Sequence, residues 1–354
     1  MTSPLLAAFQ QQVQWCEKGG APFSARVVAA AVRWLEHNDP AHEELLALTP
    51  DPLAGAVSLR LLAGLHHLAL RGINPWAALW PPGPGEPDDA ALESAVAIAW
   101  AFHGEDLRRG LASPPQTNEV QRSAALLPGL MHVAAHTGLP LGLLEIGASA
   151  GLNLWLDRYR YETPVWQWGA DTSALVLTPQ WVGTAPTLAP LQIDYRAACD
   201  VQPVDLSQPG EDLRLASYIW ADQPERLARL RAATQVAAAG MAASGVKVQA
   251  ASAAQFLRQQ LTLRLPGQAL VLMHSVMWQY MPAAEQAAIS ALMQAAGAAS
   301  TPETPLAWLR LEPPAPDVRM ELRCQIWPGG EDRLLALCHP HGARVEWLAG
   351  PATA

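Results

Sequence analysis

The stretch "LLEIGASAGLN", residues 143–153, decides how the second half of the chain is expected to fold. A short apolar run, typical of a buried strand, ends in an acidic residue and leads into a turn with two glycines. Residues with helical character follow the turn. This order of strand, glycine turn and helix is typical of the ligand-binding turns of α/β proteins, because a helix N-terminus attracts polar and anionic groups.

The turn supports two interpretations. Residues 147–151, Gly-Ala-Ser-Ala-Gly, fit the G-x-S-x-G pattern of a serine hydrolase, in which the serine attacks from a strained strand-to-helix turn. They equally fit a glycine turn that holds a cofactor against the amides beginning at Leu152. A hydrolase places its nucleophile after several strands, whereas no strand is expected here before residue 141. We therefore favour the cofactor turn and keep a hydrolase with Ser149 as nucleophile as the weaker alternative.

Residues 1–140 are expected to be helical, because apolar residues recur in them at the spacing of one helix face. The expected helices are Pro4–Glu17, Ser24–Glu36, Leu53–Arg71, Asp88–Leu111 and Asn118–Thr137. We expect residues 1–140 to form a helical N-terminal region or a lid.

From residue 141 onward, strand patterns alternate with helical patterns. Seven strands are expected, at residues 141–146, 191–200, 245–252, 268–275, 305–312, 320–328 and 332–340. The helical stretches between them imply parallel crossover units, and the last two strands form an antiparallel ribbon. We expect an α/β domain over residues 141–354 with a doubly wound, mostly parallel seven-stranded sheet and a β-hairpin inserted near residues 165–182.

The candidate site lies where the strands of this sheet end. Doubly wound sheets bind ligands beyond the carboxyl ends of their strands, near the point where the strand order reverses. The residues at these ends are Glu145, Gly147, Asp200, Ser252, His274, Ser275 and Glu312. A histidine there can act as a general base near neutral pH, so His274 is the first candidate for that role.

Composition excludes several classes of function. The chain has 354 residues, half of them hydrophobic, and a formal net charge of −9, so we expect no nucleic-acid partner, because phosphate binding needs clustered Lys and Arg. No apolar run reaches the roughly 18 residues of a membrane span, and residues 1–15 lack the basic region of a signal peptide. We expect a cytoplasmic protein that binds a small molecule and no membrane.

Metal binding is not expected. The four cysteines are widely spaced and include no C-x-x-C pair, which favours a reducing compartment. Cys338, His339 and His341 lie close together in the sequence, but closed zinc sites need four ligands at recognisable spacing. We expect the His-Pro-His stretch to form a structural turn.

Several motifs resemble those of known families. The stretches "QTNEVQRSAALLP", "EIGASAGLNLWLDRYRY", "HSVMWQY", "LAWLRLEP" and "CHPHGARVEWL" resemble a bacterial family designated domain of unknown function 2332. The second half also resembles class I S-adenosylmethionine-dependent methyltransferases, whose seven-stranded sheet ends in an antiparallel hairpin. This resemblance implies a Rossmann-like methyltransferase fold with S-adenosylmethionine as cofactor.

The resemblance also implies roles for individual residues. The cofactor-binding residues would be Glu145, Gly147, Ser149, Gly151, Asn153, Asp200 and Ser252. Asp200 would bind the ribose hydroxyls, with Asp171 as the competing choice, and Ser252 would lie near the adenine. His274 and Ser275 would face the methyl group and the substrate. The residues themselves suggest further candidates: Tyr280 lies in the polar stretch just after them, and Glu312 ends a strand at the same edge as a substrate or lid residue. Asn118 and Arg122 belong to a polar cluster that either caps the following helix or contacts the cofactor or substrate, as part of a lid.

The expected function is therefore methyl transfer to a small molecule, which mainly requires that the acceptor be positioned. Serine replaces a glycine of the first motif at position 149 and the more usual acid or amide at position 252. A methyltransferase-like module that binds a ligand without catalysis remains the alternative. The methyl acceptor and the oligomeric state are left open by the sequence.

Overall fold

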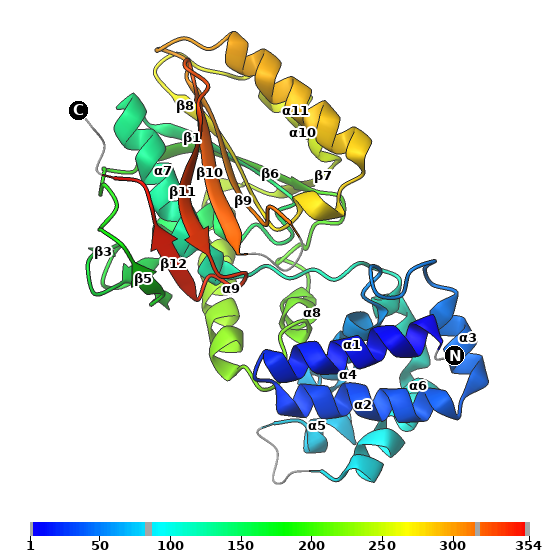
Figure 1. Cartoon of the computed structure of the whole chain (residues 1–354). Coiled ribbons are helices and arrows are strands. Elements are labelled where there is room, and N and C mark those ends of the chain that lie inside the picture. The colour runs from blue at the N-terminus through cyan, green and yellow to red at the C-terminus, as the bar shows by residue number, and fades with distance from the viewer. Residues whose placement is uncertain (1–2, 82–86, 316–318, 351–354) are drawn as a thin grey trace. The chain divides into compact units, whose positions relative to one another are not determined.

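A computed structural model describes residues 3–81, 87–315 and 319–350 of the chain (Figure 1). The chain forms two compact units, one made of Met1–Thr117 with Pro209–Ala228 and the other of Asn118–Gln208 with Arg229–Ala354. Residues 118–140 group with the second unit and residues 209–228 with the first, whereas the sequence predicts a single boundary after residue 140.

The first unit is helical, as expected. Its helices are α1 (Pro4–Lys18), α2 (Pro22–Glu36), α3 (Asp39–Leu46), α4 (Val57–Leu70), α5 (Trp76–Leu79), α6 (Asp89–Leu111), α8 (Glu211–Ser217) and the start of α9 (Pro224–Ser244). Ser3, Asn38 and Asp88 cap α1, α3 and α6, because each side chain accepts a hydrogen bond from a free amide of the first turn.

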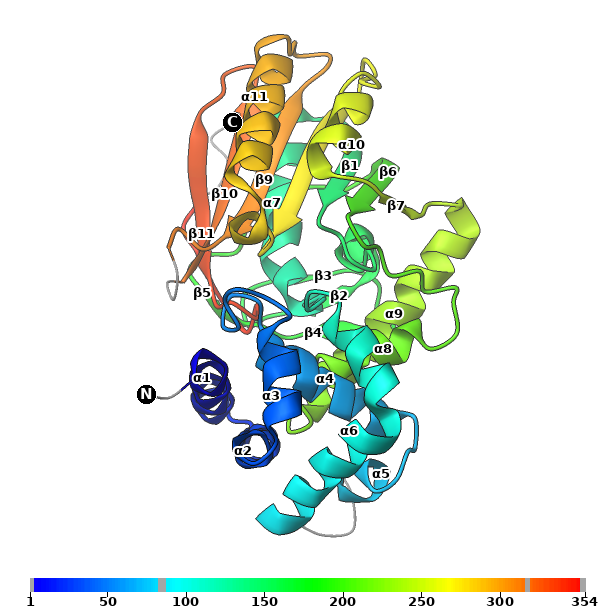
Figure 2. The same cartoon turned by 90° about the vertical axis from the view of Figure 1, so that its right-hand side faces the viewer.

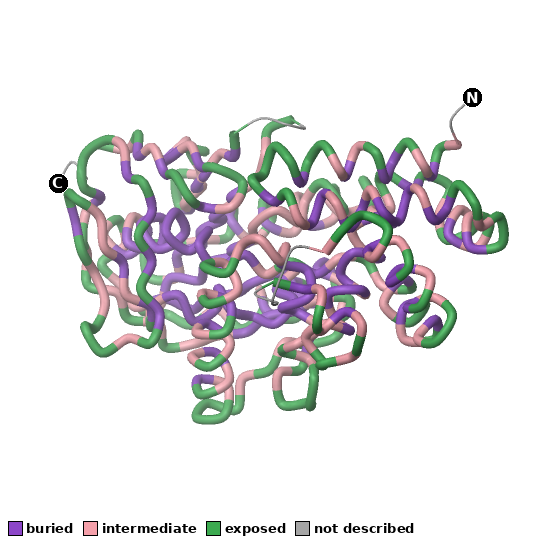
Figure 3. The backbone as a smooth tube through the Cα atoms, turned by 90° about the horizontal axis from the view of Figure 1, so that it is seen from below, coloured by how far each residue is buried: buried purple, intermediate pink, exposed green. Residues whose placement is uncertain are grey.

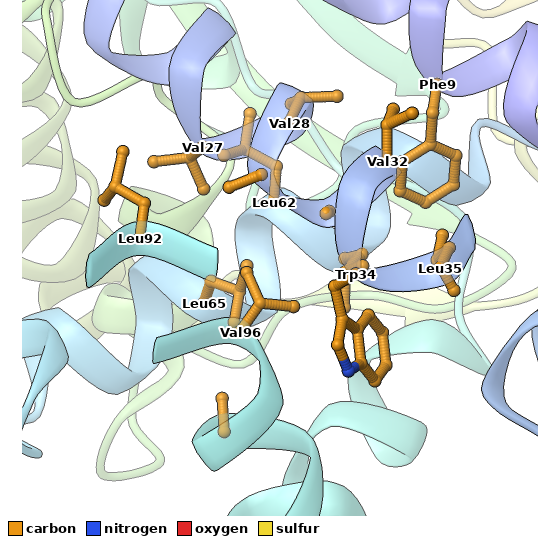
Figure 4. Close-up of a cluster of buried hydrophobic side chains, with 14 of the residues drawn as sticks. Phe9, Val27, Val28, Val32, Trp34, Leu35, Leu62, Leu65, Leu92 and Val96 are labelled. Carbon is orange, nitrogen blue, oxygen red and sulfur yellow. The ribbon is translucent and has the colours of Figure 1, made fainter. Parts of the chain in front are cut away.

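Apolar residues of these helices form the core of the first unit. Figure 4 shows Phe9, Val28 and Trp34 with neighbouring side chains that the helices direct inward. The segment Pro209–Ala228 contacts α2 through Asp222, whose carboxylate accepts hydrogen bonds from the amides of Phe23 and Ser24 at 2.8 and 2.9 Å. The N-terminus of α2 is therefore capped by a residue about 200 positions later in the chain.

The second unit is built on a nine-stranded sheet. In spatial order its strands are β5 (Gln180–Val182), β12 (Arg344–Trp347), β11 (Asp332–Cys338), β10 (Met320–Trp327), β9 (Leu306–Glu312), β8 (Ala269–Ser275), β1 (Leu141–Ile146), β6 (Ile193–Asp200) and β7 (Val248–Ala250). Strands β7, β6, β1, β8 and β9 are parallel, β10, β11 and β12 follow antiparallel, and β5 pairs parallel with β12.

The parallel strands follow the order third, second, first, fourth, fifth along the chain, which is a doubly wound order with its switch point between β1 and β8. The expectation of a mixed α/β fold with a mostly parallel sheet is confirmed. All seven expected strands form, but the sheet has nine, because β12 and β5 extend its antiparallel edge.

Helices cover both faces of this sheet (Figures 1 and 2). They are η1 (Val120–Arg122), α7 (Ser123–Thr137), η2 (Asn153–Arg158), the remainder of α9, α10 (Ala253–Gln260), η3 (Trp278–Tyr280) and α11 (Ala283–Ala298). On one face Gly129 of α7 packs against Leu309, and on the other Trp308 packs with α10 and α11. Adjacent strand residues point to opposite faces, so β9 is buried on both sides. The buried stretches are purple in Figure 3.

Two local expectations are wrong. The stretch after Gly151 forms only the 3₁₀ helix η2, because the Tyr159 and Tyr161 hydroxyls donate to the carbonyls of Leu152 and Leu156 and the Leu152 amide donates to Asn118. The segment at residues 165–182 forms no hairpin of its own. Its strands β3 (Gln167–Trp168) and β4 (Val176–Leu177) instead flank β2 (Arg160–Glu162), and β5 joins the large sheet.

None of the helices in the described part of the chain combines the length and apolar character that crossing a bilayer requires.

Candidate functional site

The candidate site lies at the carboxyl ends of β1 and β8, on either side of the switch point. The loop that follows β1, residues 147–152, contains three residues in the left-handed region, Gly147, Ser149 and Gly151, with φ of 63°, 52° and 68°. A Cβ at Gly147 would lie 2.7 Å from the Met277 side chain, and one at Gly151 would lie 2.9 Å from Val248. Both glycines are therefore required by backbone conformation and by close packing.

Backbone strain marks the loops on both sides of the switch point. Ser149 follows β1 and Val276 follows β8, and both are non-glycine residues with φ near 50°. Such a conformation costs on the order of 1–2 kcal/mol for a residue with a Cβ, and it persists only where surrounding contacts impose it. The two loops are thus held in shapes that their sequences do not favour locally.

Asp200 and Asn118 supply the contacts that hold the loop after β1. The Asp200 carboxylate accepts hydrogen bonds from the amides of Ser149, at 2.8 Å, and Gln202, at 2.9 Å. The Asn118 side chain donates to the carbonyl of Ala148 at 3.0 Å and accepts from the amide of Leu152 at 3.2 Å. The Leu152 amide is therefore occupied by Asn118, contrary to its expected availability to a ligand.

Asp200 and Asp171, the two candidates for the ribose-binding acid, lie in different places. Asp200 ends β6 and contacts the loop directly. Asp171 is highly exposed and pairs with Arg160 at 3.1 Å, next to the small sheet. The geometry therefore favours Asp200 as the acid of this site.

Three buried polar atoms of this loop region have no hydrogen-bond partner among the described residues. They are Oε2 of Glu145, Oγ of Ser149 and Oδ1 of Asn153, whose residues are 3%, 6% and 2% exposed. Buried polar groups in folded proteins are almost always paired, so these atoms are available to a water molecule or to a ligand. Their proximity in sequence, within residues 145–153, makes this loop the clearest candidate for a ligand site.

The carboxyl group of Glu145 has an unusually high pKa. Burial and, to a smaller extent, the nearby Asp200 carboxylate raise its pKa to about 8, while a backbone hydrogen bond from Leu154 opposes the change. A neutral carboxyl group is a hydrogen-bond donor as well as an acceptor. Glu145 is thus largely protonated at neutral pH and can donate to a ligand.

His274 is enclosed by protein groups on both sides of its ring. The indole Nε1–H of Trp308 donates to Nε2 at 3.1 Å, and Nδ1 contacts Oε1 of Glu312 at 2.7 Å. The His274 side chain is fully buried. Both ring nitrogens are therefore occupied, and the ring offers no free lone pair to a substrate, which the expected role of general base requires.

The other expected site residues are dispersed. Ser275 ends β8, and Tyr280 in η3 is 73% exposed. Ser252 caps α10 by accepting from the amide of Gln255 at 3.3 Å. Arg122 is buried and donates to the carbonyl of Pro340 at 2.9 Å, which joins η1 to the turn after β11. The structure thus places Glu145, Ser149 and Asn153 in or next to the loop after β1, which Asp200 and Asn118 contact from other segments, and it brings His274 and Glu312 together.

The sequence gives little signal for two important contacts. The bond between Trp308 and His274 joins β9 to β8 and depends on the register in which His274 pairs with Arg310. The loop contact of Asn118 comes from a segment thirty residues earlier in the chain. Within residues 3–81, 87–315 and 319–350, no three His, Cys, Asp or Glu side chains gather closely enough to hold a metal ion.

Comparison with known proteins places the chain in a family. Neither the curated proteins nor the solved structures yield a significant match. The sequence pattern of one bacterial family, in contrast, extends over almost the whole chain. The chain belongs to the family described as "Uncharacterized protein conserved in bacteria (DUF2332)", whose pattern matches residues 6–347.

Proposed function

We propose that the second unit binds S-adenosylmethionine at the switch point and transfers its methyl group to a small molecule. The observation that carries this proposal is the group of buried, unpartnered polar atoms of Glu145, Ser149 and Asn153, which lie at the end of β1 and in the loop and 3₁₀ helix that follow it. In doubly wound sheets this loop is where nucleotide-like cofactors bind, and the strand order of the parallel part of the sheet is of that kind.

The donor set of the loop fits such a cofactor. Ribose hydroxyls and an ammonium group need acceptors, which Oδ1 of Asn153 and the remaining lone pairs of Asp200 provide. A cofactor carboxylate needs donors, which the hydroxyl of Ser149 and the protonated carboxyl of Glu145 provide. When bound, S-adenosylmethionine supplies a methyl group on a positively charged sulfur.

The residues of the chain then have defined tasks. Asp200 and Asn118 fix the loop before a ligand arrives, which lowers the conformational entropy lost on binding. Glu145, Ser149 and Asn153 bind the polar groups of the ligand. The His274 ring holds Glu312 at the end of β9, beside the switch point, where an acceptor would be positioned.

The second candidate is a ligand-binding module without catalysis. The observation that favours it is the occupation of both His274 nitrogens, because the expected general base is then unavailable. The serine hydrolase has less support, since neither His274 nitrogen is free to activate Ser149 and the Ser149 hydroxyl has no partner among the described residues.

Calorimetric titration of the full chain with S-adenosylhomocysteine tests the proposal. We expect micromolar binding to the wild type and binding at least about tenfold weaker, or about 1.4 kcal/mol, for Asp200→Asn. Asp205→Asn is the matched control, because Asp205 lies five residues further along and its carboxylate accepts hydrogen bonds from the neighbouring Ser207 and Gln208. Absence of binding to the folded wild type, or equal loss in both variants, contradicts the proposal.

A second measurement separates the enzyme from the binding module. The wild type is incubated with S-adenosylmethionine and a panel of small acceptors, and release of S-adenosylhomocysteine is followed. Turnover with any acceptor above the rate without acceptor supports the enzyme. Binding without turnover across the panel supports the module.

A further inference from the structure

A directed series of hydrogen bonds runs from β9 to β8 and back to the end of β9. The indole nitrogen of Trp308 is a donor only, so Nε2 of His274, at 3.1 Å from it, must be the acceptor. The imidazole proton then lies on Nδ1, which donates to Oε1 of Glu312 at 2.7 Å. The series therefore has a fixed direction, and Glu312 is its last member.

Among the described residues, only one oxygen of the Glu312 carboxylate has hydrogen-bond partners. Its Oε1 atom accepts from the Nδ1–H of His274 and, at 3.3 Å, from the amide of Met277. Its Oε2 atom is buried and has no hydrogen-bond partner in the described part of the chain. The side chain as a whole is 14% exposed, so the group lies just below the surface. Oε2 is therefore the carboxylate oxygen that lacks a partner, and leaving it unpaired carries the full desolvation cost.

The surroundings favour a positively charged donor. The Trp278 ring stacks on the His274 ring, with centroids 5.2 Å apart, and meets the Trp308 ring edge-on at 5.7 Å. A hydrogen bond to a carboxylate from a charged donor is about twice as strong as a neutral one, so an ammonium group is the favoured partner of Oε2. Arg310, two residues before Glu312 on the same strand, lies over the Trp308 ring and forms an ion pair with Asp332 of β11. Its positive charge is therefore neutralised by Asp332 rather than by Glu312.

We propose that Glu312 binds the amino group of an organic amine through Oε2, and that this amine is the methyl acceptor. The second part rests on the proposed function. Oε2 of Glu312 would first accept one proton from the bound ammonium group, which frees the nitrogen lone pair. The nitrogen would then take the methyl group while the sulfur keeps the electron pair of the broken carbon–sulfur bond, and the product would leave as a methylated ammonium ion. His274 is a positioning residue in this scheme, because it acts on the amine only through Glu312.

Titration of the full chain with amines tests the inference. The probes are ethylamine, 2-phenylethylamine and putrescine, each measured by calorimetry near neutral pH. We expect at least one amine to bind the wild type and to bind Glu312→Gln at least about tenfold more weakly. The reason is that the Gln amide oxygen replaces Oε1 and its NH₂ group replaces the acceptor Oε2. Glu321→Gln is the matched control. Glu321 lies on β10 directly opposite Glu312 in the register of β10 and β9, so its replacement removes the same charge one strand away.

The role of His274 is tested with two further variants. His274→Asn keeps a side-chain N–H for Glu312, whereas His274→Ala removes it. We expect the affinity for the amine to be largely retained in the first variant and lost in the second, with the far-UV spectrum and the midpoint of thermal unfolding reporting the fold of each. Equal loss of amine binding in both folded variants contradicts the positioning role.

The same samples are titrated with S-adenosylhomocysteine, which keeps the two proposals separate. Amine binding that depends on Glu312 supports the amine site even if S-adenosylhomocysteine fails to bind, and that failure overturns methyl transfer. Failure of all three amines to bind the wild type, or binding that is equal in wild type and Glu312→Gln, overturns the amine site and leaves the cofactor proposal in place.

Discussion

Replacement of Gly147 by alanine tests the account of the loop after β1. The backbone at Gly147 is left-handed, with φ of 63°, and an added Cβ would lie 2.7–3.0 Å from three side-chain atoms of Met277. One of the three is the Met277 Cβ itself, at 3.0 Å, which no side-chain rotation can move away. The substitution therefore combines conformational strain with overpacking.

The matched control is Gly138→Ala at the end of α7. Gly138 is also left-handed, with φ of 66°, but nothing lies within 4 Å of its added Cβ. The control should lower the free energy of unfolding by about 1–2 kcal/mol, from backbone strain alone. Gly147→Ala should add about 1–3 kcal/mol of overpacking to a strain cost of the same size.

Urea unfolding followed by tryptophan fluorescence gives the free energies of both variants. Both glycines belong to the second unit, so the transition that reports this unit serves for both. A parallel difference of several degrees is expected in the thermal midpoint, since about 1 kcal/mol corresponds to roughly 2–4 °C for a domain of this size. The reasoning fails if Gly147→Ala destabilises the protein no more than Gly138→Ala does.

Two other predictions concern ionisable groups. Mainly through burial, the pKa of Glu145 is raised from its ordinary value of 4.5 to about 8. Between these pH values the folded protein keeps a proton that the unfolded chain releases, so stability should fall by on the order of 4 kcal/mol as pH rises through this range. Glu145→Gln should therefore flatten the profile of urea midpoint against pH. An unchanged profile in the variant refutes this assignment. Asp222→Ala, which leaves the amides of Phe23 and Ser24 and the Ser24 hydroxyl without their acceptor, should destabilise the helical unit by about 2 kcal/mol in the same assay. Glu105→Ala, at a side chain that is 94% exposed, should change stability by less than about 0.5 kcal/mol, and equal effects would show that the cap is unimportant.

The elements with strong local signals were predictable from the sequence. Strands β1 and β8 are almost entirely buried, and their uninterrupted apolar runs predict them directly. The proximity of Asp200 to the loop after β1 follows from strand pairing, because parallel strands end at the same edge.

Features that depend on distant contacts were not predictable. The helix expected after Gly151 is replaced by a short 3₁₀ helix, because Asn118 and two tyrosine hydroxyls take its backbone groups. Strand β5 has three residues and joins the sheet only through β12, which lies more than 150 residues later in the chain. The expected role of His274 assumed a free nitrogen, which the register of β8 and β9 removes by placing Trp308 beside it.

Hydrogen exchange with and without S-adenosylhomocysteine is the sharpest test of ligand binding at the loop after β1, because it shows which segments a ligand protects. We expect slower exchange of amides in residues 147–153 and 200–204, while the small sheet at residues 160–177 exchanges at an unchanged rate. Protection confined to other segments, or no protection at about 1 mM ligand, would contradict the assignment of the site to the loop after β1.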